Sequence, residues 1–348
     1  MQYIQLYMSP EEKLELIKRN CEEIVTEEEL KKAINEKKKL SVYLGTAVTG
    51  RPHIGYFLWV LKLADFLKAG FKVKLLLADL HGALDNTPWE LLENRFKYYS
   101  IVIPAMFESI GADIKNFEIV KGSDFQTKKE FMFDMLKMST FASVHDCKKA
   151  ASDVVKQSDN PKLSGLIYPI MQALDEEYLD VDIQYGGIDQ RKILMFAREY
   201  LPKLGYRRRI EIMTPLIPGL SAGGKMSSSD KSSKIDLIDT EADIKKKLNS
   251  AFCPEGIVED NGVLAFCKYI LFTIKQDNNE EFVIKRPEKF GGNVNYKTYE
   301  ELEKDFKEKK MHPMDLKQSL AEEINKLIEP IRKRVNSKEE LVKKAYPE

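Results

Sequence analysis

Strand-like and helix-like segments alternate from about residue 40 to residue 236, and this alternation restricts the fold more than any other feature. Short apolar segments predict strands at 41–46, 71–79, 117–122 and 181–187. Amphipathic segments predict helices at 53–70, 88–111 and 188–205. The alternation indicates an α/β fold with an open, doubly wound parallel sheet, in which ligands bind beyond the carboxyl ends of the strands.

Two regions with other patterns flank this alternation. Before it, Ser9 and Pro10 begin a helix, and Glu12 completes a capping box. After it, amphipathic segments predict helices at 240–252, 261–274, 298–310 and 314–335. We therefore expect an N-terminal helical appendage over 1–39, a sheet domain over 40–236 and a helical domain over 237–348.

The composition excludes several classes of protein. Lys and Arg number 55 and Asp and Glu also number 55, so any nucleic-acid surface must be a local patch. Such a patch is predicted between residues 191 and 247, which contain thirteen basic and seven acidic residues. The four cysteines form no CxxC pair, which argues against a disulfide scaffold and a structural metal. Without a visible secretory signal or membrane span, we expect a cytoplasmic protein.

Two glycine-rich segments have the composition of phosphate-binding loops. In the first, Gly45, Gly50 and Gly55 surround His53 where a strand leads into a helix, and a helix N-terminus favours phosphate. The segment is not GxGxxG, and taken alone His53 more often caps the turn. The second is Lys225-Met226-Ser227-Ser228-Ser229, whose lysine can neutralise a leaving pyrophosphate. By composition alone, a Gly/Ser-rich linker explains this segment about equally well.

A third segment, 168–175, places polar side chains on one face of a predicted helix. Pro169 suits the first helical position, with Tyr168 as the cap. Gln172 and Asp175 follow at i+4 and i+7, so the three polar groups span roughly 10 Å. This arrangement suits a small zwitterion with a phenol; the alternative is an amphipathic helix that exposes polar residues to water.

These segments together resemble the signatures of class I aminoacyl-tRNA synthetases. His53-Ile54-Gly55-Tyr56 resembles HIGH, and residues 225–229 resemble KMSKS. Segments YPIMQALDEEY, GGIDQRK, LLADLH, KRPEKFGG and HPMDLK are similar to the tyrosyl-tRNA synthetases of the archaeal and eukaryotic cytosolic kind, over about residues 9–347. The resemblance implies a Rossmann-like, HUP-type catalytic domain that ends in the KMSSS loop, followed by a helical anticodon-binding domain.

The resemblance also implies an activity and its residues. A tyrosine–tRNA ligase activates L-tyrosine with ATP and Mg²⁺, releases pyrophosphate, and transfers tyrosine to the 3′ end of tRNA(Tyr). The implied tyrosine-binding residues are Tyr43, Tyr168, Gln172, Asp175 and Gln190. The implied ATP-binding residues are Gly45, His53, Gly55, Gly187, Asp189, Lys225 and Met226. The implied catalytic residues are His53, Lys225, Ser227 and Ser229. The implied tRNA-binding residues are Arg191 and Lys192 at the acceptor stem and Phe290 and Asn293 at the anticodon.

The family implies a homodimer, and we expect the helix at 88–110 to offer Tyr98, Tyr99, Ile101 and Met106 to a two-fold contact; their alternative use is core packing. Three residues depart from the family pattern: Tyr56, Ser228 and Asn293. The alternatives that remain open are a tryptophanyl-tRNA synthetase, a small-molecule nucleotidylyltransferase, and a non-catalytic RNA-binding paralogue.

Overall fold

The computed structural model describes residues 8–36, 39–154, 162–224, 226 and 234–347. Lys225, Ser227 and Ser229 therefore lie outside the described residues. The described chain divides into two compact units. The first comprises Met1–Thr49, Lys62–Ser100 and Asp113–Pro215, and the second comprises Gly50–Leu61, Ile101–Ala112 and Leu216–Glu348.

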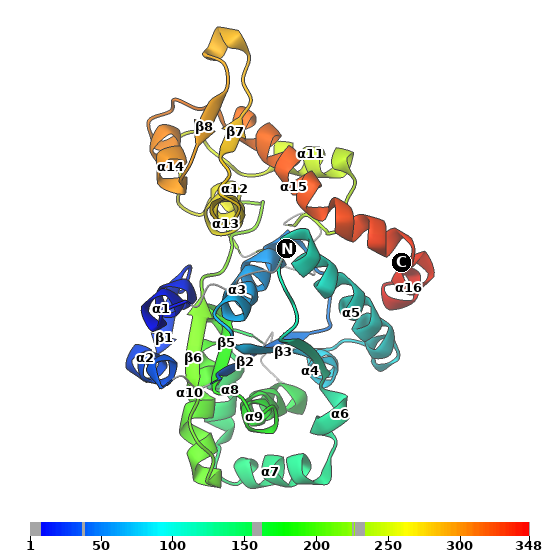
Figure 1. Ribbon diagram of the computed structural model, residues 1–348. Coiled ribbons are helices and arrows are strands. Elements are labelled where there is room, and N and C mark those ends of the chain that lie inside the picture. The colour runs from blue at the N-terminus through cyan, green and yellow to red at the C-terminus, as the bar shows by residue number, and fades with distance from the viewer. Residues whose placement is uncertain (1–7, 37–38, 155–161, 225, 227–233, 348) are drawn as a thin grey trace. The chain divides into compact units, whose positions relative to one another are not determined.

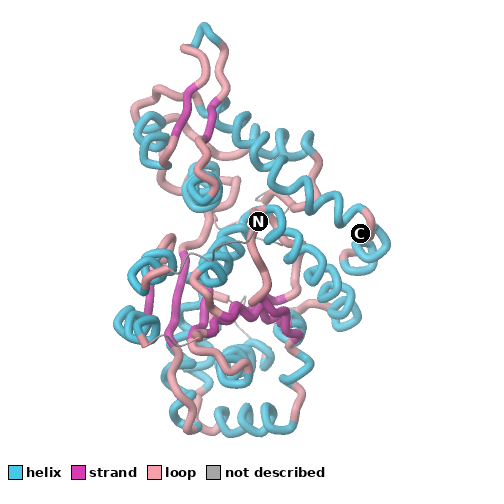
Figure 2. The backbone as a smooth tube through the Cα atoms, in the orientation of Figure 1, coloured by secondary structure: helices cyan, strands magenta, loops and turns pink. Residues whose placement is uncertain are grey.

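The first unit is built on a sheet, drawn in magenta in Figure 2. In the described part of the chain its strands are β1 (Glu23–Val25), β2 (Ser41–Ala47), β3 (Lys72–Ala78), β4 (Phe117–Lys121), β5 (Ile183–Gly187) and β6 (Ile210–Thr214). Their order is β1-β6-β5-β2-β3-β4, and all neighbours are parallel except β1 and β6. The order reverses between β2 and β5, which makes this pair the topological switch point. The predicted doubly wound α/β sheet is confirmed.

Helices pack on both faces of this sheet. The helices that lie wholly or partly in the first unit are α1 (Pro10–Lys18), α2 (Glu27–Asn35), α3 (Phe57–Lys68), α4 (Asp79–Leu84), α5 (Leu92–Ser109), α6 (Ser123–Gln126), α7 (Lys129–Ser139), α8 (Val144–Ala151), α9 (Leu163–Tyr178) and α10 (Arg191–Tyr200). In Figure 1, α8, α9 and α10 gather on one face, where Tyr43 and Leu174 belong to a single buried cluster. On the other face, Phe66 of α3 contacts Tyr185 of β5 at a ring separation of 6.1 Å.

The second unit is mainly helical. Its further helices are α11 (Glu241–Ser250), α12 (Gly262–Phe266), α13 (Phe272–Asp277), α14 (Tyr299–Lys307), α15 (Pro313–Asn336) and α16 (Glu339–Ala345). A π-helical turn, Cys267–Leu271, joins α12 to α13. The strands β7 (Phe282–Ile284) and β8 (Val294–Tyr296) pair as an antiparallel hairpin. The long helix α15 buries Leu316, Leu320 and Ile324 at the helical spacing that the sequence predicts.

Several local predictions are confirmed and others are wrong. Ser9 and Glu12 form the capping box, and Gly70 adopts φ +87° after α3. Helix α9, in contrast, begins at Leu163, so Tyr168 and Pro169 lie inside it and not at its start. Pro169 has no N–H to donate to the carbonyl of Gly165, so one hydrogen bond of the helix is missing. The helix continues past it, and the residues on either side of Pro169 are buried. The sequence patterns did not predict β1, β6, α7 or α8.

The predicted two-fold contact through α5 is not supported at most of its residues. Tyr98, Tyr99 and Met106 are each at most 1% exposed, so they pack in the interior. Ile101 is half-buried. The apolar spacing of α5 was a signature of core packing, which was the alternative reading of the same residues.

Candidate active site

The first unit gathers polar side chains near the carboxyl ends of β2, β3, β4 and β5. Asp175 of α9 is the most deeply placed carboxyl among them, at 1% exposed. Gln126 Nε2 donates to its Oδ1 at 2.7 Å, and His81 Nε2 lies 3.8 Å from its Oδ2. Burial raises the pKa of Asp175 well above its usual range, because a charged carboxylate is poorly solvated there. The Asp175 carboxyl can accept a hydrogen bond from a hydroxyl, and its protonated form can also donate one.

The other predicted tyrosine-binding residues lie in the same unit. Tyr43 of β2 is fully buried, and its hydroxyl donates to the carbonyl of Gln172 at 3.3 Å. Gln172 Nε2 donates to Gln190 Oε1 at 3.1 Å, which joins α9 to the short 3₁₀ turn Ile188–Gln190 after β5. Tyr168 is 8% exposed. Helix α9 therefore carries Tyr168, Gln172 and Asp175 with the predicted spacing.

His81 and Gln126 were not assigned from the sequence. His81 is fully buried and stacks edge-on against Tyr168 at a ring separation of 4.6 Å. Burial lowers the pKa of His81 to about 4, so the imidazole is neutral at neutral pH. Both residues follow a strand closely, His81 after β3 and Gln126 after β4. Their position at the carboxyl edge of the sheet was the sequence signal that would have found them.

Three predicted ATP-binding residues also lie at this edge of the first unit. Gly45 is an exposed position in β2, Gly187 is the last residue of β5, and Asp189 follows in the 3₁₀ turn. A Cβ at Gly45 would meet Tyr43 at 3.7 Å, an ordinary contact. The absence of a side chain there leaves the strand end open beside the buried tyrosine.

The predicted HIGH-like segment lies in the second unit. His53 is 5% exposed and precedes the 3₁₀ turn Ile54–Tyr56, where its Nδ1 accepts from the Gly55 N–H at 3.2 Å. Burial and the nearby Lys234 lower the pKa of His53 to about 3. The ring is therefore neutral, and because Nδ1 accepts, its proton resides on Nε2. His53 thus caps the turn, which was the alternative role given above for this residue. Its Nε2–H remains a hydrogen-bond donor.

Gly55 and Met226 lie directly beside His53. A Cβ at Gly55 would come within 2.9 Å of His53 Cε1 and 3.1 Å of Met226 Sδ. The Met226 N–H donates to the Ile217 carbonyl at 3.0 Å. The absence of a side chain at Gly55 thus allows the turn, the imidazole and the residue after Lys225 to pack together.

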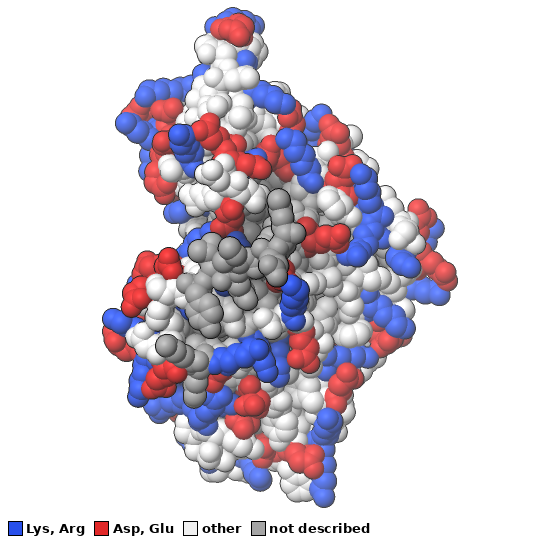
Figure 3. Space-filling view, viewed as in Figure 1, with Lys and Arg blue, Asp and Glu red and all other residues white. Residues whose placement is uncertain are grey.

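The predicted positive patch is partly neutralised within the protein. Arg191 forms two hydrogen bonds with Glu23, at 2.6 and 2.9 Å, and Lys192 Nζ lies 2.8 Å from Asp153. Arg209 is buried and donates to Glu177 at 2.7 Å. In Figure 3, basic and acidic side chains are interspersed over the visible face. The basic count between 191 and 247 therefore overstates the charge available to RNA.

Phe290 and Asn293 lie on the connection between β7 and β8. Phe290 is 60% exposed, and Lys289 Nζ lies 4.9 Å from its ring centroid. Asn293 Oδ1 accepts from the Arg286 N–H at 3.2 Å. Gly291 follows Phe290 with φ +94°, a conformation that favours glycine and turns the chain. The predicted base-stacking residue is thus accessible and does not pack in the interior.

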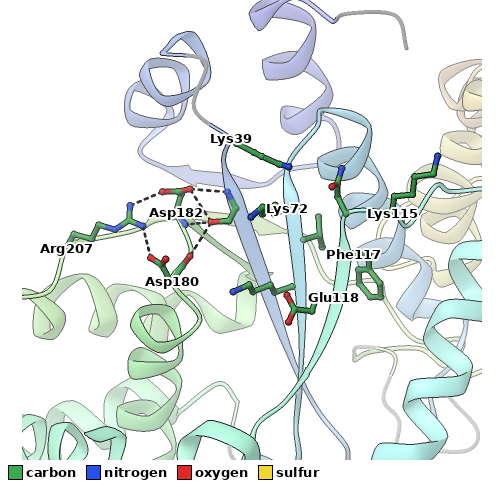
Figure 4. Close-up of a pocket in the computed structure, with 12 residues that line it drawn as sticks. Lys39, Lys72, Lys115, Phe117, Glu118, Asp180, Asp182 and Arg207 are labelled. Carbon is green, nitrogen blue, oxygen red and sulfur yellow. Dashed lines mark hydrogen bonds and ion pairs between the residues drawn. The ribbon is translucent and has the colours of Figure 1, made fainter. Parts of the chain in front are cut away.

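A hollow of about 520 Å³ lies at the amino ends of β2, β3 and β4, the edge opposite the residues above (Figure 4). Lys39, Lys72 and Arg207 contribute positive charge to it. Asp182 accepts from Ser41 and, at 2.9 Å, from Arg207. Arg207 pairs with Asp180 and Asp182 there, and none of the predicted site residues lines the hollow.

Within the described ranges, no group of His, Cys, Asp or Glu side chains has the arrangement of a metal site. The helices of those ranges include none that is both long and apolar enough to cross a membrane.

The strand order, the buried polar side chains near the carboxyl ends of the strands and the histidine turn agree with the resemblance to class I synthetases. A family model described as tRNA synthetases class I (W and Y) matches residues 35–329, and the chain belongs to this family. It is 53% identical over 342 residues to a cytoplasmic tyrosine–tRNA ligase of Gallus gallus, covering 97% of this chain. It is 49% identical over 350 residues to the cytoplasmic tyrosine–tRNA ligase of Saccharomyces cerevisiae, covering 98% of this chain and 89% of the relative.

Solved structures of class I synthetases are also similar to this chain. A tyrosyl-tRNA synthetase from Archaeoglobus fulgidus, complexed with L-tyrosine, is 40% identical with a TM-score of 0.86, covering 94% of this chain and all of that one. A tryptophanyl-tRNA synthetase from Aeropyrum pernix, with a TM-score of 0.68, is 18% identical and covers 92% of this chain and 84% of that one, so it shares the fold alone. The resemblance to tyrosyl-tRNA synthetases is confirmed. The chain spans 64% of the length of the Gallus gallus relative.

Proposed function

We propose that this chain is a tyrosine–tRNA ligase, which activates L-tyrosine with ATP and then transfers it to the 3′ end of tRNA(Tyr). The observation that carries the proposal is the buried Asp175 with Gln126 and Tyr43 near it, in a chain about half identical to tyrosine–tRNA ligases. The tryptophan alternative has less support, because that similarity extends only to the fold.

Selection of tyrosine follows from the polarity of the pocket. The substrate hydroxyl would exchange hydrogen bonds with Asp175 and Tyr43, while Tyr168, Gln172 and Gln190 would hold the amino group and orient the carboxylate. Phenylalanine would leave these buried polar groups unpaired. Sites of this type discriminate by about 10⁴–10⁵, so no separate editing site is required.

The activation step requires no nucleophile from the protein. The tyrosine carboxylate attacks the α-phosphorus of ATP, its new O–P bond forms as the bond to pyrophosphate breaks, and pyrophosphate leaves with the electron pair. His53 would donate from Nε2 to a phosphate oxygen, and Lys225, with Ser227 and Ser229, would neutralise the leaving group. Gly45, Gly55, Gly187, Asp189 and Met226 would line the nucleotide. Mg²⁺ would arrive with the nucleotide, since the His53 turn offers nitrogen donors and not a set of oxygen ligands.

The transfer step needs RNA contacts in both units. Arg191 and Lys192 would exchange their carboxylate partners Glu23 and Asp153 for acceptor-stem phosphates or bases. Phe290 and Asn293 would meet the anticodon.

In functional terms we divide the chain into an appendage over 1–39, a catalytic domain over 40–236 and an anticodon-binding domain over 237–348. We assign the protein to the cytoplasm, in keeping with the names of its relatives.

We assign the homodimer contact to an apolar patch on α7 and the residues after it. Phe133 and Leu136 are 53% and 59% exposed on α7, and Phe141 and Val144 continue the patch. Such exposed apolar side chains favour burial against a second copy. Leu136→Asp should convert a dimer to a monomer in light scattering at micromolar concentration. A wild-type chain that is already monomeric would contradict the assignment.

The activity is tested by ATP–pyrophosphate exchange with tyrosine, tryptophan and phenylalanine in separate reactions, followed by charging of tRNA(Tyr). Exchange that depends on tyrosine alone is the expected result. Exchange supported by tryptophan would favour the tryptophan enzyme. Binding of tRNA without exchange for any of the three would indicate a non-catalytic paralogue.

A further inference from the structure

Three charged residues of the second unit surround the backbone of the His53 turn. Asp236 and Lys234 are 3% and 4% exposed, unusual depths for charged side chains. Arg51 Nε lies 2.9 Å from Asp236 Oδ2, and Lys234 Nζ donates to the Arg51 carbonyl at 3.0 Å. Lys234 Nζ also lies 4.0 Å from Asp236 Oδ2. These three residues are called the Arg51 cluster below.

Backbone pairing joins the same two segments. His53 and Asp236 form an antiparallel bridge, and the Ile54 N–H donates to the Ile235 carbonyl at 3.0 Å. Asp236 is itself held by its N–H, which donates to Asp239 Oδ2 at 2.8 Å. The segment 234–236 is therefore fixed both to the turn before it in sequence and to the start of α11 after it.

The orientation of His53 depends on this pairing. Its Nδ1 accepts from the Gly55 N–H only while residues 53–55 keep their turn, and the bridge to Asp236 holds the first residue of that turn. A nearby ammonium group on Lys234 also disfavours a second proton on the ring. The first effect places the single ring proton on Nε2, and the second keeps the ring neutral.

We propose that Arg51, Lys234 and Asp236 are positioning residues for His53, which hold its imidazole as a neutral Nε2–H donor in a fixed orientation. The positioning of His53 does not depend on the proposed function. Only its expected effect, a higher rate of adenylate formation, rests on that function. The cluster contains none of the predicted tyrosine-binding residues. Its loss should therefore affect the rate of activation and not the binding of tyrosine.

The test compares Asp236→Asn with a matched control, Lys317→Met. Lys317 is also buried in the second unit and donates to backbone carbonyls, those of Asn249 at 3.1 Å and Ala251 at 2.7 Å, but it bonds to no part of the His53 turn. Asp236→Asn should lower kcat for tyrosine-dependent exchange by about 10- to 100-fold, because small displacements of a catalytic group have effects of that size. Its KM for tyrosine should stay within about twofold of wild type. Lys317→Met should lower the melting temperature and leave kcat of the folded enzyme unchanged.

Two further measurements test the positioning of His53 independently of Asp236→Asn kinetics. Arg51→Lys retains the charge and should give a kcat between those of wild type and Asp236→Asn, even if Asp236→Asn folds poorly. The ¹⁵N shifts of the His53 ring should report one neutral Nε2–H tautomer in wild type and a mixture in the variants, whether or not the chain has ligase activity. An unchanged kcat and tautomer in both variants, or equal losses of kcat and tyrosine affinity, would overturn the proposal. A wild-type chain without exchange activity but with the expected tautomer would contradict only the proposed function.

Discussion

The predicted tyrosine-binding site of the first unit and the His53 turn of the second unit are constructed differently. The predicted site consists of buried and half-buried side chains that bond to one another, as Gln126 does to Asp175 and Gln172 to Gln190. The His53 turn is held mainly by backbone hydrogen bonds, and it presents one neutral imidazole. The difference indicates that recognition depends on the side chains that line the predicted site, whereas activation depends on a turn held by backbone pairing and by the Arg51 cluster. Changes in the pocket should alter tyrosine affinity, and changes near His53 should alter kcat.

The largest expected effect is at Asp175. Asp175→Ala should lower kcat/KM for tyrosine by about 10³-fold or more, because the substrate hydroxyl loses a buried partner. Pyrophosphate exchange at subsaturating tyrosine measures the loss. Asp134→Ala is the control, since Asp134 is also buried and accepts from the Tyr178 hydroxyl at 2.9 Å, outside the pocket. Wild-type exchange by Asp175→Ala would remove Asp175 from the pocket.

The complementary prediction concerns Lys225, which lies outside the described residues. Lys225→Ala should lower kcat by about 10²- to 10³-fold and leave tyrosine binding nearly intact, because the lysine is proposed to stabilise only the leaving pyrophosphate. Lys203→Ala, at an exposed lysine, is the control. Comparable losses in tyrosine affinity and kcat would indicate a structural role and weaken the contrast between the two regions.

Phe290 should affect neither tyrosine affinity nor exchange. Stacking of a base on an exposed aromatic ring is worth about 1–3 kcal/mol, so Phe290→Ala should weaken tRNA charging by about 5- to 150-fold. Val283→Ala, at a 38% exposed residue of the same hairpin, is the control. Unchanged charging across a range of tRNA concentrations would exclude an anticodon contact at Phe290.

The smallest predicted effect is a pH dependence of stability. The pKa of Asp175 is higher in the folded chain than in the unfolded chain, so its contribution to stability falls as pH rises between those two values. Between a pH near the usual pKa of a carboxyl group and a pH well above it, the free energy of unfolding of ligand-free wild type should fall more than that of Asp175→Asn. Thermal melting at both pH values measures the difference. Parallel pH profiles would show that Asp175 is ionised in the folded chain.

The sequence predicted the helices and strands of this molecule better than the contacts between residues that are distant in the chain. Strands β2 and β3 and the spacing of Tyr168, Gln172 and Asp175 were predictable, because apolar runs and helical periodicity are local properties. Strand β6 has five residues after three consecutive arginines, and its burial follows from pairing with β5, which no local pattern contains. The bonds from Gln126 to Asp175 and from Arg51 to Asp236 join residues 49 and 185 positions apart, so only the fold brings them together.

Strand β1 has a consequence for how this chain behaves during folding and storage. It pairs antiparallel with β6 and thereby satisfies a row of backbone donors and acceptors that would otherwise form an open edge. Helix α1 of the same appendage is also attached, because Lys62 Nζ donates to the Ile17 carbonyl at 2.8 Å. Removing the appendage would leave the apolar strand β6 as a template for strands of other molecules. A chain that begins at residue 40 should therefore lose solubility and self-associate into β-rich aggregates.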